Sequence, residues 1–367
     1  MTKRQQFVDY VKNGGKQFCS PQIGAGAGFD TKLAGKTWIG ETTFEDTKAA
    51  IERFDILPLY NFGIDPGMVN PELQWKVTAT ENTETMRKTE MEMVTKAGTI
   101  TQTCVEEPIK GGYRTKCPMT SEDELGILEY YVDATLDGDF STITNVVKSW
   151  RNLVGEDGVL DVQWAVQPYE MFCLYDTVNT VMIVMDYEDQ CKKIMEKVLE
   201  FNRKAFKAVK AGGADFVFLG GPGSEMISPR FYKDFLIPYS KITTSDAHNE
   251  GLLIYSHICS PIEPFLTMGF YNEMGMDLFE TLSPAPVGNV ESIADALTKL
   301  EPRICTRGNI GLDVLLTQTP EVVRQKTIDV IEQSRGRKHI VAASDYLFYD
   351  IPEENLHAMV DACKEFC

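Results

Sequence analysis

The feature that most constrains the fold of this chain is a regular alternation of short β-rich runs and amphipathic helical stretches after residue 160. The β-rich runs occupy residues 216–219, 252–257, 277–282, 304–309 and 339–344. The helical stretches occupy residues 191–211, 229–249, 261–274, 290–299, 320–334 and 353–366. In the first of these, apolar residues recur every three to four positions, which marks one buried helix face. Alternation at this pace predicts parallel strands joined by right-handed crossovers.

Five consecutive strand–helix units favour an α/β fold of the (β/α)8 TIM-barrel type, with the first three strands in the less regular N-terminal half. An open doubly wound sheet is the alternative, but no G-x-G-x-x-G motif follows a predicted strand, so its nucleotide-binding form has little support. We therefore interpret the 367 residues as one domain. Residues 1–160 are expected to form an N-terminal elaboration with the early barrel elements, and residues 161–367 the regular βα half.

The N-terminal half predicts a helical start and a small β elaboration. Residues 1–15 have the pattern of a short amphipathic helix and lack the apolar core and cleavage site of a signal peptide. Residues 74–115 alternate polar and apolar side chains in places, which predicts a small antiparallel sheet or hairpin. A further helix is expected to begin at Thr120 or Ser121, where a capping residue precedes several acidic residues.

The charge balance limits the partners of this chain. It has 36 Lys and Arg against 54 Asp and Glu, which gives a formal net charge of −18. Nucleic acids and anionic membrane surfaces are therefore disfavoured as partners, and no stretch approaches the roughly 20 apolar residues of a membrane helix. The nine cysteines are scattered, odd in number and without a C-x-x-C pair. This usage favours a reducing cytoplasm over a disulfide framework.

Polar side chains follow the predicted strands at the positions where a parallel barrel carries its functional groups, the C-terminal strand ends. The residues selected in this way are Glu225, His257, Cys259, Glu280, Asn309, Ser344 and Asp345. Tyr255 is expected to face the same interior as His257, because side chains two positions apart lie on one face of a strand. The structural alternatives are a helix-dipole role for Glu225, turn formation for Asn309 and core packing for Tyr255.

His257 and Cys259 form an H-x-C pair at the end of a predicted strand. Imidazole and thiolate together suit Zn²⁺, and Glu280 on the next strand could add an oxygen ligand. Three protein ligands with one open position are typical of a catalytic zinc site. The alternative interpretation is a buried free thiol beside a hydrogen-bonded core histidine.

Several longer segments of the C-terminal half carry a family resemblance. They are GGPGSEMISPRFYKDFLIPYSK, GLLIYSHICSPIEPFLTMGF, MDLFETLSPAPVGNV, ICTRGNIG and IPEENLHAMVDA. In these segments the chain resembles the uroporphyrinogen decarboxylase-like superfamily. That superfamily includes uroporphyrinogen decarboxylases and zinc methyltransferases that work with a corrinoid protein. True decarboxylases carry an arginine-rich segment of the R-Q-A-G-R type near the N-terminus, but residues 24–30 contain no arginine, which disfavours the decarboxylase.

The zinc methyltransferases of the superfamily carry H-x-C, a glutamate on the next strand and a late cysteine. His257 and Cys259 match the first element, and Glu280 matches the second. The late cysteine is absent, because Ser344 and Asp345 occupy the segment where it should fall. The resemblance implies zinc held by His257, Cys259 and Glu280, with solvent, substrate or Asp345 completing the coordination. The departure also leaves open a site that has lost its metal.

The resemblance implies a methyltransferase that is similar to methylcobamide:coenzyme M methyltransferases and to the methyltransferases of anaerobic O-demethylase systems. It would move a methyl group from a small molecule, by preference a methoxylated one, to the cobalt of a corrinoid on a partner protein. Zinc would act as Lewis acid. The expected catalytic residues are Glu225 and Asn309, and the expected substrate contacts are Tyr255, Ser344 and Asp345. The alternatives are a methylcobamide:thiol methyltransferase, a metal-free decarboxylase-like protein and a metal-free binding protein.

Overall fold

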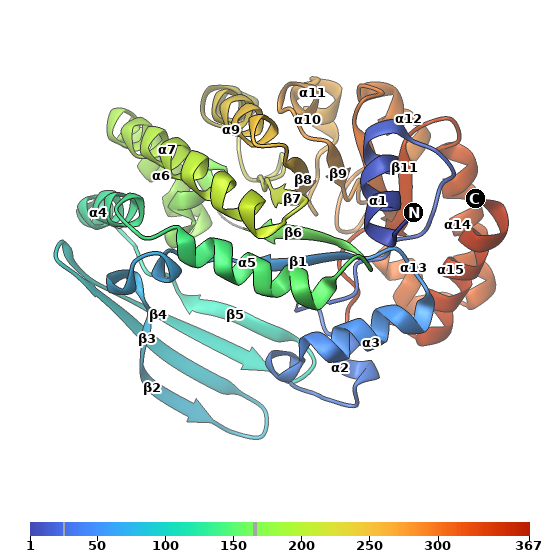
Figure 1. Cartoon of the computed structure of the whole chain (residues 1–367), viewed down its shortest axis with the longest axis horizontal. Helices are drawn as coiled ribbons and strands as arrows, with labels where there is room; N and C mark the ends of the chain where they lie inside the picture. Colours follow the sequence, from blue (N-terminus) through green and yellow to red (C-terminus); the bar gives the residue numbers. More distant parts are fainter. Residues whose placement is uncertain (25, 164–166) are drawn as a thin grey trace.

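The centre of the structure is a curled parallel sheet with helices around its outside (Figure 1). The structure is a computed structural model that describes residues 1–24, 26–163 and 167–367. Within these residues the central sheet has seven strands in the order β1-β6-β7-β8-β9-β10-β11. The strands are β1 (Leu59–Gly63), β6 (Val159–Gln163), β7 (Phe216–Phe218), β8 (Leu253–His257), β9 (Leu278–Glu280), β10 (Cys305–Ile310) and β11 (His339–Ala343).

The helices of the C-terminal half alternate with these strands. They are α7 (Glu188–Gly212), α8 (Pro229–Phe231), α9 (Ile237–Asn249), α10 (Glu263–Thr267), α11 (Phe270–Glu273), α12 (Ile293–Lys299), α13 (Leu312–Thr317), α14 (Pro320–Gln333) and α15 (Glu353–Phe366). The five predicted β-rich runs coincide with β7 to β11, and the predicted helix at 191–211 lies within α7. The predicted apolar face of α7 is buried, including Ile194, Val198 and Phe201. The alternation therefore predicted this half of the fold correctly.

The remaining α-helices precede this regular half. They are α1 (Lys3–Asn13), α2 (Phe29–Leu33), α3 (Phe44–Phe54), α4 (Leu125–Leu136), α5 (Ser141–Val154) and α6 (Thr177–Asp186). Short 3-10 or π segments occur in both halves and are η1 (Ile39–Glu41), η2 (Pro66–Met68), η3 (Pro71–Leu73), η4 (Glu122–Glu124), η5 (Pro168–Leu174) and η6 (Tyr232–Leu236). The helix expected at Thr120 or Ser121 begins as η4 and continues as α4, and the backbone N–H of Ser121 donates to Glu124 Oε2 over 2.8 Å.

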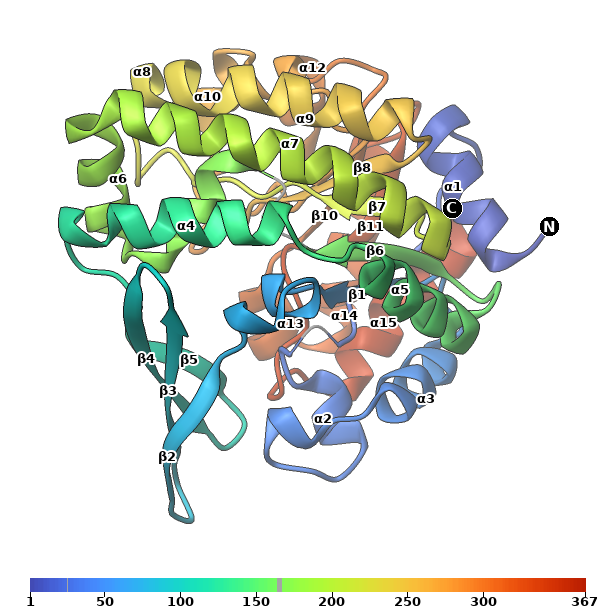
Figure 2. The same cartoon turned by 60° about the vertical axis from the view of Figure 1, so that its left-hand side comes forward.

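A second sheet confirms the β elaboration that residues 74–115 predicted. It is antiparallel and consists of β2 (Lys76–Asn82), β3 (Arg87–Thr95), β4 (Gly98–Glu107) and β5 (Gly111–Lys116). This sheet projects away from the body of the curled sheet (Figure 2). Met93 on β3 and Ile100 on β4 are buried in the main core and anchor it, whereas β2 is exposed along its whole length.

The prediction of an eight-stranded barrel needs correction, because the central sheet of the described residues has seven strands and is not closed. Between β11 and β1 the backbone contributes one isolated bridge, in which Cys19 pairs with Val341. The hydroxyl of Ser20, the next residue, donates a hydrogen bond to the carbonyl oxygen of Leu57 over 2.6 Å. Pro21 follows, and because proline has no backbone N–H it cannot continue the hydrogen-bond ladder of the sheet. The place of the missing strand is therefore filled by an irregular segment.

One end of the curled sheet is closed by α1. This helix begins with a capping box between Thr2 and Gln5 and buries Phe7, Tyr10 and Val11. These side chains pack in one cluster with the first inward-facing residues of the strands, which are Leu59, Val159, Phe216, Tyr255, Leu278, Cys305 and Ile340. This end of the interior is therefore apolar and filled.

Further along the same strands the interior becomes polar. Side chains two positions apart lie on one face of a strand. Counting two positions on from the apolar cluster gives five polar residues, Asn61, Asp161, His257, Glu280 and Arg307, and two apolar ones, Phe218 and Ala342. The interior thus changes from an apolar layer at α1 to a mainly polar layer near the C-terminal ends of the strands.

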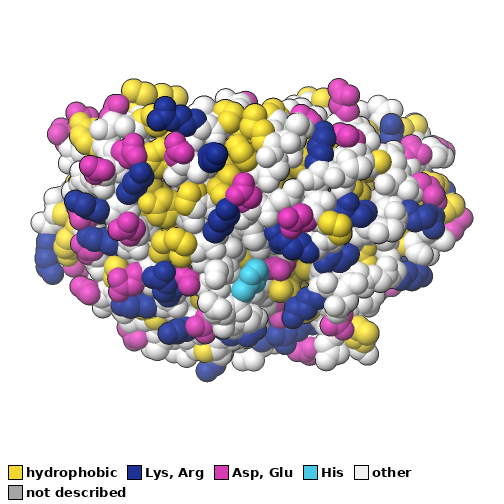
Figure 3. All heavy atoms as spheres, turned by 90° about the horizontal axis from the view of Figure 1, so that it is seen from above, with side chains coloured by type: hydrophobic (Ala, Val, Ile, Leu, Met, Phe, Trp, Pro, Cys, Tyr) yellow, Lys and Arg dark blue, Asp and Glu magenta, His cyan; other side chains and the backbone are white. Residues whose placement is uncertain are grey.

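The surface carries both signs of charge. Figure 3 shows basic and acidic side chains interspersed over one face of the molecule. Such mixing fits a net charge of −18 that serves solubility more than the binding of one oppositely charged partner. Among the described residues no helix is long and apolar enough to cross a membrane.

His339, at the start of β11, makes the stability of this fold sensitive to pH. Its Nδ1 lies 2.9 Å from Thr306 Oγ1, and its Nε2 lies 2.9 Å from the carbonyl oxygen of Gly308. Since a carbonyl can only accept, Nε2 carries the proton and the ring is neutral. Burial lowers the pKa of His339 from 6.5 to about 4. The unfolded chain therefore takes up a proton on acidification before the folded chain does.

We predict that the free energy of unfolding falls by about 2 kcal/mol through His339 when the pH is lowered from 7 to 5. The loss begins near pH 6.5, the pKa in the unfolded chain, and is complete near pH 4, the pKa in the folded chain. Urea unfolding at both pH values measures the loss. The His339→Asn variant should not show this pH-dependent loss of unfolding free energy. The His357→Asn variant, which changes a half-exposed histidine, should show the same loss as the wild type. Equal pH dependence of the wild type and His339→Asn would contradict the prediction.

Candidate functional site

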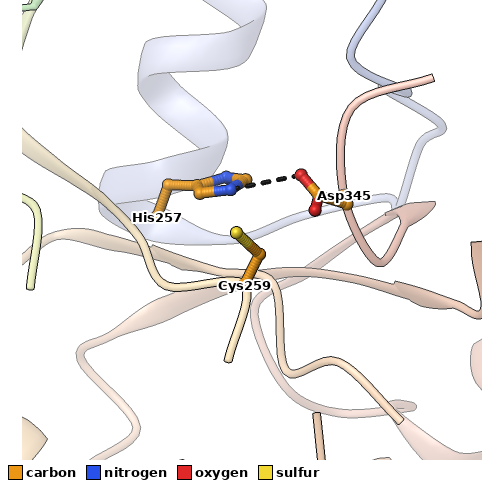
Figure 4. A group of neighbouring side chains, drawn as sticks. All are labelled: His257, Cys259 and Asp345. Atoms are coloured by element: carbon orange, nitrogen blue, oxygen red, sulfur yellow. Dashed lines mark ion pairs between the residues drawn. The ribbon is translucent and has the colours of Figure 1, made fainter. Parts of the chain in front are cut away.

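Three potential metal ligands meet at the C-terminal ends of β8 and β11. His257 is the last residue of β8, Cys259 follows two residues later, and Asp345 follows β11. One ligand atom from each residue lies within 4.8 Å of the others. The thiol of Cys259 and the carboxylate of Asp345 both point toward the imidazole (Figure 4). His257 Nε2 lies 3.3 Å from Asp345 Oδ1.

The imidazole of His257 is held from its other side. Its Nδ1 lies 2.6 Å from Glu280 Oε1, and the ring stacks on Tyr346 with centroids 4.7 Å apart and planes at 18°. A carboxylate at Nδ1 fixes the proton on that nitrogen and directs Nε2 toward the other two groups. Within the described part of the chain, Nε2 is buried and makes no hydrogen bond, although Asp345 Oδ1 approaches it at ion-pair distance. This ligand atom is thus directed at Asp345 and Cys259 without a hydrogen bond that would occupy it.

Glu280 is the centre of a buried polar network. Its Oε1 accepts from the hydroxyl of Tyr255 as well as from His257, and its Oε2 lies 3.0 Å from Arg307 Nη1. Arg307 is 1% exposed. Burial raises the pKa of Glu280, but Arg307 and the two hydrogen bonds outweigh burial and leave the pKa below its ordinary value. Glu280 is therefore an ionised carboxylate inside the fold.

The N-terminal segment completes this network. Arg307 Nε donates to the carbonyl oxygen of Ser20 over 2.8 Å, and Nη1 donates to Gln22 Oε1 over 2.8 Å. The hydroxyl of Tyr255 also lies 3.2 Å from Gln22 Oε1. The segment that fills the gap between β11 and β1 therefore also binds the guanidinium that neutralises Glu280.

The electrostatics of the group favour a cation. Burial lowers the pKa of His257, but Asp345, Cys259 and Glu280 outweigh it and raise the pKa well above 6.5. Positive charge at the position of Nε2 is therefore stabilised. A divalent ion would meet the same field and would displace the proton from Nε2.

The donor set fits zinc. Nitrogen, sulfur and carboxylate oxygen are all ordinary ligands of Zn²⁺, and three protein ligands leave a fourth position open. The carboxylate on Nδ1 matches the pattern in which metal-binding histidines are oriented by a carboxylate partner. Two observations support this fit: the buried Nε2 makes no hydrogen bond among the described residues, and the surrounding field stabilises positive charge.

The structure arranges the predicted ligands differently from the sequence interpretation. Glu280, predicted as the third metal ligand, lies at Nδ1 of His257, and both its oxygens already have partners. Asp345, which the sequence suggested as a substrate contact or an additional oxygen ligand, is the third member of the group. Both changes follow from the curling of the sheet, which brings the loop after β11 to the end of β8.

The remaining predicted residues occupy varied positions. Tyr255 is fully buried beneath the group and contacts Glu280, and burial together with the charge of Glu280 raises its pKa well above 10. Asn309 lies within β10 and not in the turn that the alternative interpretation expected, and it donates its side-chain N–H to the carbonyl oxygen of Leu282 over 3.1 Å. Ser344 is buried next to Asp345 with no hydrogen bond to its hydroxyl among the described residues. Glu225 is exposed in the turn after β7.

Sequence reasoning missed two charged residues of the interior. Arg307 lies within a predicted buried run, and a charge in such a run signals a buried partner. Asp161 is completely buried, and neither carboxyl oxygen has a hydrogen-bond partner among the described residues. Burial, with the charge of Glu280 as a smaller cause, raises the pKa of Asp161 well above its ordinary value. Asp161 is therefore a neutral acid next to the ionised Glu280.

Comparison with known proteins identifies the family of this chain. The model of the family "Uroporphyrinogen decarboxylase (URO-D)" matches residues 168–366, more than half of the chain. The chain belongs to this family.

Individual relatives differ in their activities. A uroporphyrinogen decarboxylase from Prochlorococcus marinus (strain NATL1A) is 26% identical over 154 residues, 41% of this chain and 41% of the relative. A methylated-thiol–coenzyme M methyltransferase from Methanosarcina mazei is 29% identical over 168 residues, 43% of this chain and 40% of the relative. The chain thus matches about two fifths of the length of these relatives.

The fold also has a solved counterpart. A methyltransferase from Methanosarcina mazei superposes with a TM-score of 0.71 and covers 100% of this chain and 99% of the other, at 15% sequence identity. At this identity the likeness concerns the fold, including its N-terminal elaboration.

Removal of the Arg307 guanidinium tests the central network. We predict that Arg307→Met lowers the free energy of unfolding by about 3–5 kcal/mol, because it leaves a buried carboxylate without its counter-ion. Urea unfolding at pH 7 measures the change. The double variant Arg307→Met/Glu280→Gln should recover part of it.

Arg324→Met is the matched control, since its partner Glu365 is exposed and the change should be about 1 kcal/mol or less. If Arg307→Met lowered the free energy of unfolding no more than Arg324→Met does, the predicted contribution of the buried Arg307–Glu280 pair to stability would be contradicted.

Proposed function

We propose that this protein is a methyltransferase that moves a methyl group from a small molecule, by preference a methoxylated one, to the cobalt of a corrinoid on a partner protein. The observation that carries the proposal is the group of His257, Cys259 and Asp345 at the C-terminal edge of the sheet. A methyltransferase among the relatives and another among the solved structures of the same fold support it.

The proposed metal site uses His257 Nε2, Cys259 Sγ and a carboxylate oxygen of Asp345. When bound, zinc would supply Lewis acidity to the atom from which the methyl group leaves. The open fourth position is where the methyl donor would bind.

The residues around the site prepare it for this task. Glu280 keeps the proton of His257 on Nδ1, so Nε2 stays directed at the other ligands. Arg307 keeps Glu280 ionised. Tyr346 stacks on the imidazole and restricts its rotation. These contacts hold the ligand set in one geometry before any ligand arrives.

The oxygen ligand favours activation of a methyl donor over activation of a thiol acceptor. A carboxylate gives less electron density to a bound metal than a thiolate does, so Asp345 in place of a second cysteine leaves the metal more electrophilic. A methylcobamide:thiol methyltransferase is therefore the second candidate.

Decarboxylation is a third candidate, because curated decarboxylases are among the relatives. The absence of arginine from residues 24–30 argues against it. In that case the chain would act without metal on a polycarboxylate.

Metal analysis tests the proposed site. The protein purified without chelators is expected to contain about one zinc ion per chain. His257→Ala and Cys259→Ser should lose it, and cobalt substitution should show a thiolate charge-transfer band that is absent from Cys259→Ser. The control His357→Ala should retain the metal. Equal metal content in His257→Ala and the wild type would refute this ligand assignment.

A spectral assay with cob(I)alamin tests the reaction. Aryl methyl ethers, methyl thioethers and methylamines are offered in turn, and formation of methylcobalamin is followed by its colour. We expect an ether to react and His257→Ala to lower the rate about 100-fold or more, the scale of a lost electrophilic group. Methylation of coenzyme M from methylcobalamin without any reaction of ethers would favour the second candidate, and release of CO2 from uroporphyrinogen the third.

A further inference from the structure

Glu170, in η5 after β6, places a carboxyl group in the interior of the curled sheet. A Cβ atom at Gly220 would lie 1.7 Å from Glu170 Oε1. Phe216 belongs to the interior cluster and Phe218 packs against it. Because side chains alternate along a strand, the inward positions continue at Gly220. The Glu170 carboxyl therefore occupies the interior space that a side chain at position 220 would fill.

This carboxyl lies at the same edge of the sheet as the metal-binding group. Phe218 is opposite Tyr255 in the β7–β8 register, and the N–H of Leu219 donates to the carbonyl oxygen of Tyr255 over 2.8 Å. Continuing this register by two residues brings Gly220 beside His257. Glu170, which reaches this level from η5 beside Gly220, thus lies on the side of the interior where β8 carries His257 of the proposed metal site.

The surroundings of the Glu170 carboxyl are apolar or neutral. No hydrogen bond or ion pair joins it to another residue in the described ranges. The titratable groups that face it are Tyr169 and Cys173 from η5 and Tyr232 from η6. Burial raises the pKa of both tyrosines, which are therefore uncharged near neutral pH, and Cys173 is an exposed thiol. Arg114, a cation on this side of the fold, donates to the carbonyl oxygen of Cys173 over 3.2 Å.

The ionisation of Glu170 agrees with this setting. Part of the residue surface is accessible, but burial of the carboxyl alone raises its pKa from 4.5 to about 8. Glu170 is therefore mainly protonated at neutral pH. A neutral carboxylic acid can donate a hydrogen bond or a proton.

We propose that Glu170 is the proton donor of the methyl transfer, an assignment that rests on the proposed function. The bond between the donor heteroatom and the methyl carbon breaks, and its electron pair stays on the heteroatom. A lone pair of the acceptor, a cob(I)alamin-type nucleophile, forms the new bond to the methyl carbon. The proton of Glu170 passes to the heteroatom, and the resulting carboxylate takes a proton from solvent.

This assignment narrows the class of methyl donor. Methyl ethers and methyl thioethers release an alkoxide, phenoxide or thiolate, which a proton stabilises. A quaternary ammonium or sulfonium donor releases a neutral molecule and needs no proton. A neutral carboxyl also offers no charge to attract such cations. Glu170 therefore points to uncharged ethers or thioethers as substrates.

The kinetic test compares wild type and Glu170→Gln on aryl methyl ethers whose phenols differ in acidity, with cob(I)alamin as acceptor. We expect a loss of about 100-fold for the least acidic phenol, as is usual for a lost general acid, and a smaller loss for more acidic phenols. Trimethylsulfonium, which releases neutral dimethyl sulfide, should react within about threefold of wild type. Glu200→Gln, an exposed change on α7, is the matched control.

A second readout requires neither donor nor corrinoid. In protein labelled with ¹³C at the glutamate carboxyls, one signal should remain protonated at pH 7, titrate near pH 8 and be absent from Glu170→Gln. A titration near the ordinary value would overturn the proposal. Equal losses with ethers and sulfonium would reveal a structural role and would also overturn it.

The experiments distinguish a failure of the proton-donor role of Glu170 from a failure of the proposed methyltransferase function. Wild-type protein that transfers methyl groups while Glu170→Gln does so equally well with ethers would overturn the proton donor alone. Wild-type protein that transfers no methyl group from any donor would overturn the proposed function, and the proton donor with it.

Discussion

The pairing of Glu280 with Arg307 inside the curled sheet is the interaction on which the candidate site depends. Two charges removed from water are costly unless further hydrogen bonds satisfy them. Here Tyr255 and His257 donate to the carboxylate, and Ser20 and Gln22 accept from the guanidinium. The pair thereby links β8, β9 and β10 to the N-terminal segment.

The consequence of this pairing reaches the proposed ligands. Because Glu280 stays ionised, it holds the proton of His257 on Nδ1 and leaves Nε2 free to face Cys259 and Asp345. The carboxylate of Glu280 therefore has two roles. It neutralises the buried Arg307, which stabilises the fold, and it orients the imidazole of His257, which the proposed chemistry requires.

The polarity of the inward-facing side chains changes from one end of the curled sheet to the other. At the α1 end it is filled by aromatic and aliphatic side chains. The next layer contains ionised and neutral acids in close proximity, Glu280 and Asp161, because only Glu280 has a cationic partner. The proposed metal-binding group and the proposed proton donor Glu170 lie at the open edge. Separate environments within one interior thus allow acids with different charge states to act side by side.

The alternation of strands and helices after residue 160 was sufficient to predict β7 to β11, because buried parallel strands and amphipathic helices leave strong periodic signals. The early barrel was not predictable in the same way. Its place between β11 and β1 is taken by one bridge at Cys19, followed by Pro21, and an irregular segment of this kind has no period to detect. The antiparallel sheet of β2 to β5 was predictable in position, although its number of strands was not.

For the candidate site, the positions of the β-rich runs were enough to place His257, Cys259, Glu280 and Asp345 at the strand ends. Their roles became apparent from the three-dimensional arrangement. The curled sheet brings β11 to β8 across many intervening residues, which sets Asp345 beside His257 and leaves Glu280 behind the ring. It also inserts Glu170 from η5 into the space that Gly220 leaves open. Such proximities depend on register and curvature in three dimensions, which spacing along the chain does not encode.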